Sequence, residues 1–153
     1  MDDSPNIRGA FIGLDLGHTQ ADLIRASMEG IALGLRLALD ALRRLTRVSD
    51  EMIIVGGGGR SRLWRQICAD VFDLKIVKTN IDQDAAALGA AAVAAVGAGI
   101  WRDVSMVDEI HRIEDVSEPV QENREKYQAL LPVFARGARC HAELGELLSQ
   151  LRL

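Results

Sequence analysis

The feature that most constrains how this chain can fold is a short apolar run that stops at four consecutive glycines. The run, Met-Ile-Ile-Val at residues 52–55, shows no polar alternation, so it predicts a strand covered on both faces, as in a parallel sheet. The glycines are Gly56, Gly57, Gly58 and Gly59. Ser61 can cap a helix that extends to about Phe72, and residues 74–77 predict a second strand. The order strand, helix, strand predicts an α/β fold with a right-handed crossover.

Helical periodicity marks the longer segments on either side of this unit. From Thr19 to about Arg47 apolar residues recur at spacings of three to five, which predicts one long helix with a single buried stripe. The stripe consists of Leu23, Met28, Ile31, Leu35, Leu39, Leu42 and Leu45. A last helical stretch runs from Gln121 to the end, and Pro132 should break or kink it because proline lacks an N–H donor.

Shorter elements complete the prediction. Residues 9–14 predict a short strand or extended segment, and residues 103–120 a short helix followed by a linker. Small residues dominate the helix predicted over residues 83–97, so another backbone can approach it closely, and we expect it to pack tightly against the sheet. The helix that Ser61 caps should turn four apolar side chains inward. These are Leu63, Trp64, Ile67 and Val71.

Composition narrows the class of protein. The chain has 153 residues, with 18 Lys and Arg against 22 Asp and Glu, and 48% of its residues are hydrophobic. This length suits one domain, or one domain with a tail, and it can bury a core without a metal or disulfide. The net charge of −4 offers no electrostatic footprint for nucleic acid or an anionic membrane, so we expect neither as a partner.

No segment has the pattern of an export signal or a membrane span. The acidic N-terminus lacks an apolar core, and the longest uncharged run, residues 85–101, is mostly Ala and Gly. We therefore expect a soluble, cytoplasmic protein. Cys68 and Cys140 form no Cys-x-x-Cys motif, so we expect two buried, reduced thiols and no metal site.

The glycine run is also the strongest candidate for a binding site. A strand that stops at glycines and leads into a helix brings unsatisfied backbone N–H groups and the positive end of the helix dipole to one point, which suits a phosphate. The P-loop pattern is absent, and Ser61 stands where the last glycine of the dinucleotide fingerprint belongs. The local sequence alone leaves both a nucleotide site and a plain tight turn open.

Three motifs in sequence order resemble those of a known family. Gly9-x-Phe11-x-Gly13-Leu14, followed after seven residues by Asp22-Leu23-x-x-Ala26-Ser27-Met28-Glu29, is similar to the C-terminal signature of the FGGY carbohydrate kinases. Residues 56–66 resemble the adenosine-binding loop and following helix of the xylulokinase-like branch. Asp84-x-x-Ala87-Leu88-Gly89-Ala90-Ala91 resembles a later helix of the family. The resemblance covers roughly residues 7–101 and continues weakly to the end.

The resemblance implies part of an actin-like, ribonuclease-H-like ATPase lobe, with short parallel strands, packed helices and a helical C-terminal tail. Residues 1–101 would form the ATP-binding C-terminal lobe, incomplete at its start, and residues 102–153 a helical extension that packs on the same lobe. Family members are several-fold longer, and their N-terminal lobe carries the sugar site and the catalytic aspartate. We therefore assign no catalytic residue here and expect the chain to be inactive alone.

The resemblance also implies which residues bind ATP. They are Gly56, Gly57, Gly58, Gly59, Arg60 and Ser61. Gly57 and Gly58 would lie against the nucleotide phosphates with Ser61 nearby, Gly56 and Gly59 would shape the turn, and Arg60 could reach the nucleotide. Mg²⁺ would arrive with the nucleotide rather than at a dedicated metal site.

Four further positions have implied roles outside the nucleotide site. Glu29 and Asp84 would orient loops and helix ends, and the His18-Thr19 pair would begin the long helix as a capping and packing element.

The reaction implied is phosphoryl transfer from ATP to a hydroxyl of a pentulose such as xylulose, with the sugar held by the missing lobe. The alternatives are the same reaction on another ketose or on a polyol such as glycerol, a non-catalytic nucleotide- or partner-binding module from a truncated kinase gene, and a plain α/β packing domain whose glycines only turn the chain. Strands without their neighbours expose a sheet edge, so we expect self-association.

Overall fold

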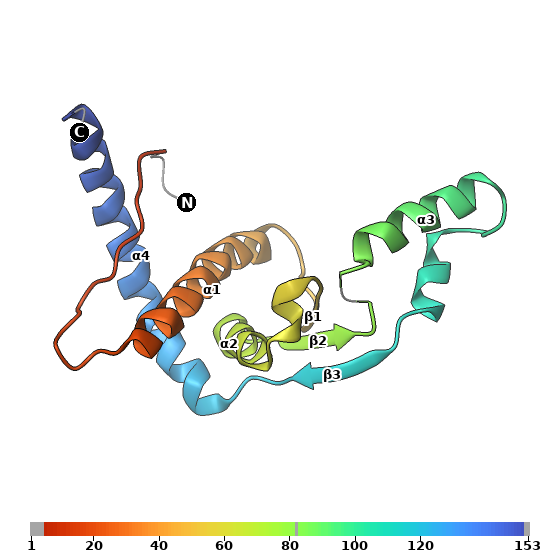
Figure 1. Cartoon of the computed structure of the whole chain (residues 1–153), viewed down its shortest axis with the longest axis horizontal. Helices are drawn as coiled ribbons and strands as arrows, with labels where there is room; N and C mark the ends of the chain where they lie inside the picture. The colour runs from red at the N-terminus through yellow and green to blue at the C-terminus, as the bar shows by residue number, and fades with distance from the viewer. Residues whose placement is uncertain (1–4, 82, 152–153) are drawn as a thin grey trace. The chain divides into compact units, whose positions relative to one another are not determined.

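The computed structural model describes residues 5–81 and 83–151. The chain divides into two compact units (Figure 1). Residues 49–119 form the sheet unit, which contains every described strand, and the segments before and after it form the helical unit, which contains two long helices.

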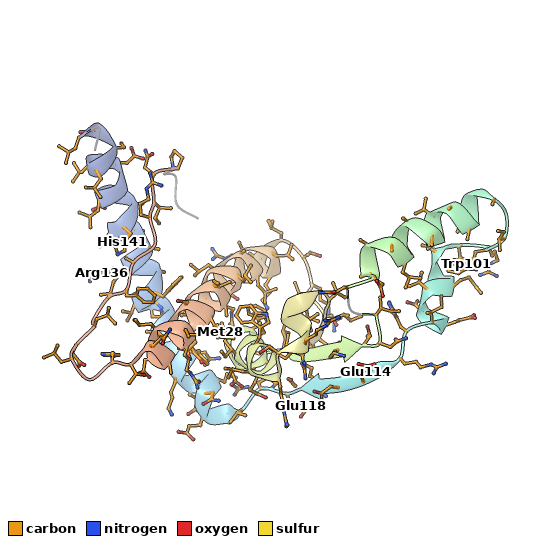
Figure 2. All side chains as sticks on the ribbon, in the orientation of Figure 1. Met28, Trp101, Glu114, Glu118, Arg136 and His141 are labelled. Atoms are coloured by element: carbon orange, nitrogen blue, oxygen red, sulfur yellow. The ribbon has the colours of Figure 1, made fainter. Side chains whose placement is uncertain are left out.

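The sheet unit is built on three strands in the order β1-β2-β3. β1 (Glu51–Ile54) pairs in parallel with β2 (Lys75–Thr79), and β3 (Ile113–Ser117) pairs antiparallel with β2. α2 (Arg62–Phe72) connects the two parallel strands, which confirms the predicted strand–helix–strand unit and the α/β class. Ion pairs on the β3 side join Lys78 to Glu114 and Lys75 to Glu118, the two glutamates labelled in Figure 2.

α2 provides much of the core of the sheet unit. Its inner side packs on β2 and β3 because apolar residues repeat along it with the helical period. The buried apolar residues of this core are Ile67, Cys68, Ala69, Val71, Phe72, Leu74, Ile76 and Val77. The prediction that Leu63 points inward is wrong, since Leu63 is exposed and the charged Arg65 is buried instead.

Two predictions about strands are corrected by this sheet. β1 is an edge strand of the described sheet, with Ile53 exposed and its neighbours at most half-buried, so it is not covered on both faces. An apolar run shows which residues can be buried, but not how many strands flank them. The predicted linker contains β3. The acidic residues of β3 have a low propensity for strands, so the sequence did not predict one there; hydrogen bonds to the edge of β2 outweigh that low propensity.

α3 (Ala85–Gly97) confirms the helix predicted over residues 83–97 but not its packing. It contacts η2 (Val104–Glu109), a 3-10 helix that corresponds to the short helix predicted after residue 103. Within the described part of α3 one residue, Ala92, is buried. Tight packing on the sheet is therefore wrong for α3, because its small side chains present little apolar area to hold it there.

The helical unit consists of α1 (Gln20–Leu45), α4 (Gln121–Gln150) and the segment before α1. Thr19 caps α1, as expected: its hydroxyl oxygen accepts from the N–H of Asp22, and Asp22 Oδ2 accepts from the N–H of Thr19 at 2.8 Å. The hydrogen bonds from Thr19 hold the pKa of the Asp22 carboxyl below its ordinary value. The predicted start of the long helix is thus confirmed.

The apolar stripe predicted for α1 is only partly buried. Leu39 is buried, together with Ala32 and Leu33, which the stripe did not include. Other members are exposed, namely Ile31, Leu35, Leu42 and Leu45. The spacing identified a face that can be covered, whereas burial also depends on which element packs against that face.

α4 is continuous through Pro132, so of the break or kink predicted there the break is wrong. Proline removes the hydrogen bond to the carbonyl of Gln128. Both residues are exposed, so water can satisfy that carbonyl and the helix continues.

The segment before α1 runs along α4 (Figure 1). Asn6 Nδ2 donates to the carboxylate of Glu146 at 3.2 Å, and the Ile12 side chain lies against Gly137. Of the short strand or extended segment predicted over residues 9–14, the strand is wrong: these residues are irregular and exposed, because the segment lies on a helix that offers no strand edge for ladder hydrogen bonds.

The two cysteines differ in exposure. Both are free thiols, but Cys68 is buried and Cys140 is exposed, so the expectation of two buried thiols is wrong for Cys140. Burial raises the pKa of the Cys68 thiol to about 11. Within residues 5–81 and 83–151, none of the helices combines the length and the apolar character needed to cross a bilayer.

Candidate nucleotide-binding turn

The six predicted site residues form one continuous turn between β1 and α2. Gly56 has φ +83°, a left-handed conformation that glycine adopts without steric cost, and the 3-10 helix η1 (Gly57–Arg60) follows it. The N–H of Gly59 donates to the carbonyl of Gly56 at 3.0 Å. The N–H groups of Gly57 and Gly58 lie in the first turn of this 3-10 helix, where no carbonyl of the helix can accept from them.

Ser61 ends the turn and begins α2. Its hydroxyl oxygen accepts from the N–H of Trp64 at 3.2 Å, which confirms the predicted cap. Its own N–H donates to the carbonyl of Gly58 at 3.1 Å, so the cap and the glycine turn are joined. The partial positive charge of the α2 N-terminus therefore lies beside the glycines.

Gly57 and Gly58 have different surroundings. A Cβ atom on Gly58 would lie 3.1 Å from Nε1 and 3.2 Å from Cδ1 of Trp64, which is tighter than ordinary van der Waals contact. A Cβ atom on Gly57 would meet only Nε2 of Gln83 within 4 Å, at 3.8 Å. A side chain at position 58 would therefore make Trp64 shift by a few tenths of an ångström whatever the turn binds, whereas the open face of Gly57 can accept a ligand.

A second turn, after β2, lies beside the glycine turn. The carboxyl ends of parallel strands meet at one edge of a sheet, and the nearness of Gln83 to Gly57 reflects this. Asn80 fixes the second turn, since its Oδ1 accepts from the N–H of Arg112 at 2.7 Å and its N–H donates to the carbonyl of Arg112 at 2.9 Å. Gln83 was not predicted as a site residue, and strand order was the signal that could have found it.

Arg65 is the second residue that sequence reasoning missed. It is 4% exposed; its Nη1 donates to the carbonyl of Gly59 at 2.5 Å, and its Nη2 donates to the carboxylate of Asp115 on β3. The hydrogen bond from Arg65 holds the pKa of the Asp115 carboxyl below its ordinary value. The available signal was spacing: position 65 shares the buried side of α2 with Cys68 and Phe72, where a charged residue is unusual.

The remaining predicted positions lie apart from this turn or at its rim. Arg60 is exposed at the end of η1. Asp84 occupies the N-cap position of α3 but makes no side-chain capping hydrogen bond. Glu29 belongs to the helical unit, where it accepts from Arg25 and from Tyr127.

Metal ligands do not gather at the turn. The described residues contain no group of three or more His, Cys, Asp or Glu side chains that could hold a metal ion. The expectation that Mg²⁺ arrives with a nucleotide stays a prediction.

Comparison with known proteins identifies the class to which this α/β unit and its turn belong. The sequence model for the C-terminal domain of the FGGY family of carbohydrate kinases matches residues 1–98, well over half of the chain. The chain therefore belongs to the FGGY family of carbohydrate kinases.

Xylulose kinases are among its most similar relatives. The chain is 35% identical over 129 residues to the xylulose kinase of Staphylococcus epidermidis, an alignment that covers 84% of this chain and 26% of the relative. It is 35% identical over 113 residues to the glycerol kinase of Rhodopirellula baltica, an alignment that covers 73% of this chain and 21% of that kinase. Ligand-bound xylulose kinase from Lactobacillus acidophilus has a TM-score of 0.80 at 29% identity, covering 90% of this chain and 28% of that one.

These comparisons confirm the predicted family and its actin-like fold, here a mixed α/β structure with a small sheet and a helical C-terminal end. The chain spans about a quarter of the length of the relatives it matches.

Proposed function

We propose that this chain is the ATP-binding part of a sugar kinase that phosphorylates a pentulose such as xylulose. The observation that carries the proposal is the glycine turn between β1 and α2, found in a member of a carbohydrate kinase family whose similar relatives include xylulose kinases. A cytoplasmic location, where ATP is supplied, belongs to the same proposal.

The chemistry of the turn supports binding of a nucleotide phosphate. The N–H groups of Gly57 and Gly58 and the N-terminus of α2 offer donors and positive potential to an anion. The open face of Gly57 lets a phosphate approach the backbone, and Arg60 in the same turn can add a positive charge. Mg²⁺ bound with the nucleotide would neutralise developing charge during transfer of the γ-phosphoryl group.

Phosphoryl transfer also needs an acceptor hydroxyl and a base beside it. We propose that a second lobe of the kinase supplies the sugar site and that base. The chain by itself then binds nucleotide without sugar-dependent turnover, which an ADP-release assay with xylulose would test; turnover by the chain alone would contradict this part of the proposal.

Calorimetric titration with ATP and ADP, with Mg²⁺ present, tests the binding step. Gly57→Ala is the informative variant, because the added methyl group meets only the flexible end of Gln83 and so leaves the unliganded turn intact. We expect it to weaken ATP binding at least about tenfold, because the methyl group occupies the side on which the phosphate would lie. Gly58→Val would displace Trp64 and cannot separate binding from packing.

Gly34→Ala in α1 is the matched control, since a Cβ atom there meets nothing within 4 Å and Gly34 belongs to the helical unit. Equal affinity of the wild type, Gly34→Ala and Gly57→Ala would contradict placement of the phosphate at Gly57. Absence of binding by the wild type would contradict nucleotide binding by this chain alone.

A second candidate substrate is a polyol such as glycerol, because a glycerol kinase is as similar in percentage identity as the xylulose kinase. Reconstitution with the N-terminal lobe of a xylulose kinase and, separately, with that of a glycerol kinase distinguishes the two candidates, because the lobe with which this chain restores turnover on its own substrate indicates the kind of kinase to which the chain belongs. ATP binding without turnover with either lobe would favour the non-catalytic module.

We also propose that the isolated chain self-associates. The support is the number of large apolar side chains that it exposes, above all along α1 and on the edge strand β1.

A further inference from the structure

Arg65 combines deep burial with a position between the glycine turn and β3. Two of its guanidinium nitrogens donate in different directions, Nη1 to the carbonyl of Gly59 and Nη2 to the carboxylate of Asp115. Its Nε is buried and has no hydrogen-bond partner among the described residues. The guanidinium is planar and rigid, so it fixes the separation of the two groups that it binds.

Both backbone polar groups of Gly59 are therefore held by hydrogen bonds. Its N–H donates to the carbonyl of Gly56 and its carbonyl accepts from Arg65. Gly59 is also buried, although it lies in a turn of otherwise exposed or half-buried residues. The position of the whole turn relative to β3 thus depends on one side chain of α2.

Stability alone is a weak explanation for this arrangement. The ion pair joins a buried guanidinium to an exposed carboxylate. It contributes little net stability, because water screens the attraction at Asp115 and desolvation of the guanidinium offsets what remains. The unpartnered Nε adds a further cost. What an apolar side chain could not do is set the distance between the Gly59 carbonyl and Asp115.

We propose that Arg65 is the positioning residue of the glycine turn, and that through Asp115 it holds the N–H groups of Gly57 and Gly58 in the arrangement that receives a phosphate. The inference rests on the proposed function, because it assigns Arg65 to that same site. Arg65 does not touch the nucleotide in this proposal and acts through Gly59.

Trp64 provides a readout that needs no nucleotide. Its indole ring lies against Gly58, so its fluorescence reports the position of the turn. The chain has two tryptophans, and Trp101→Phe leaves Trp64 as the sole emitter. Amide hydrogen exchange over residues 57–61 reports the same turn independently.

The experiment compares Arg65→Lys, Arg65→Met and Asp115→Asn in the Trp101→Phe background. Lysine keeps the charge but lacks the planar fork, methionine keeps the volume but lacks donors, and asparagine keeps an acceptor but lacks the charge. Arg102→Lys, at an exposed position of the same unit, is the matched control.

We expect Arg65→Lys and Arg65→Met to shift Trp64 emission, to speed exchange of the turn amides about tenfold and to weaken ATP binding by a similar factor. Asp115→Asn should act in the same direction with a smaller effect, and Arg102→Lys should change nothing. Exchange in the core of α2 serves as the folding check. It should stay slow, whereas a purely structural role would speed it together with the turn.

Two results would overturn the inference. One is unchanged Trp64 emission and turn exchange in both Arg65 variants, even if the wild type binds ATP. The other is equal loss of protection in the turn and in the core of α2 for both variants. A shift of the turn in a protein that binds no ATP would instead support the positioning role and refute the proposed function.

Discussion

Tyr127 of α4 donates its hydroxyl hydrogen to Oε1 of Glu29 on α1 at 2.8 Å, across 98 positions of sequence. The same carboxylate oxygen accepts from Nε of Arg25 at 2.7 Å. Because Tyr127 is 8% exposed, water cannot easily replace Glu29 as the acceptor. This buried hydroxyl therefore links the two long helices of the helical unit.

Tyr127→Phe should lower the free energy of unfolding by about 1–2 kcal/mol, since it removes one partly buried hydrogen bond to a charged acceptor and keeps the ring. Urea denaturation followed by circular dichroism measures the change. Phe134→Leu, a conservative change at a half-buried position of α4 without a polar group, controls for general effects of altering that helix. An unchanged unfolding midpoint in Tyr127→Phe would show that the hydrogen bond contributes nothing.

The same hydroxyl predicts a dependence of stability on alkaline pH. Burial, and then the hydrogen bond to Glu29, raise the pKa of Tyr127 to about 12 from an ordinary value of 10.0. The folded protein keeps a proton that the unfolded chain loses, so this contribution is complete below pH 10 and is lost as the pH rises toward 12. The stability difference between wild type and Tyr127→Phe should shrink across that interval; a constant difference would refute the assignment.

Gly145→Ala should release the segment before α1 from α4. A Cβ atom at this position would lie 2.4 Å from the carbonyl oxygen and 2.8 Å from the carbonyl carbon of Asn6, and backbone atoms cannot rotate away as a side chain can. Limited proteolysis within residues 5–14 should become faster while α4 stays helical, because alanine favours the helix.

Gly137→Ala is the matched control for that substitution. It lies on the same helix and faces the same segment, but its Cβ atom would meet Ile12 Cδ1 at an ordinary 3.5 Å. Equal rates of cleavage in the two variants would mean that the contact at Asn6 does not hold the segment.

The sequence predicted local structure better than it predicted neighbours. The helix caps at Thr19 and Ser61 and the parallel strand pair followed from residue chemistry close in sequence. β3 could not be found in the same way, since its hydrogen bonds come from β2, which lies more than thirty positions earlier. The prediction of which α1 residues are buried was only partly right for the same reason, because the spacing of apolar residues does not specify which element packs against them.

In the candidate site too, features set by neighbouring residues were predicted and features set by distant contacts were not. The glycine turn was predicted as a unit because its residues are consecutive, and the structure brings them together in one turn. Gln83 and Asp115 reach the turn through strand order and through Arg65, and neither relationship is visible along the sequence. Whether the turn binds ATP stays a prediction.

The two thiols should react at very different rates. Cys140 is exposed, whereas Cys68 is buried and has a pKa of about 11, so little of it is thiolate at pH 8. Alkylation with iodoacetamide followed by mass spectrometry should label Cys140 and leave Cys68 unlabelled until denaturant is added. Cys140→Ser should abolish labelling of the native protein; persistent labelling would show that Cys68 becomes accessible.

Self-association should depend on the exposed apolar face of α1. This face consists of Ile24, Ile31, Leu35, Leu42 and Leu45. These positions follow the spacing of a helix-pairing seam. The first turn of α1 is acidic at Asp22 and its last turn is basic at Arg43 and Arg44, which favours antiparallel pairing of two copies.

Leu35→Glu lies at the middle of this face and should lower the mass measured by light scattering toward that of the monomer. Val93→Glu, an equally drastic change at an exposed position of α3, is the control. A monomeric mass for the wild type at all concentrations would contradict the proposed self-association.

The helical unit is made from two segments that the sheet unit separates, which sets an order of events during biosynthesis. Lys75 touches both ends of the sheet unit, since its N–H donates to the carbonyl of Asp50 at 3.1 Å and its Nζ pairs with Glu118 at 3.0 Å. The sheet unit is therefore a continuous segment able to close on itself, and its last residue is made before the first residue of α4. α1 is made before the sheet unit and its partner α4 after it, so the face of α1 that packs on α4 stays uncovered until α4 has been made.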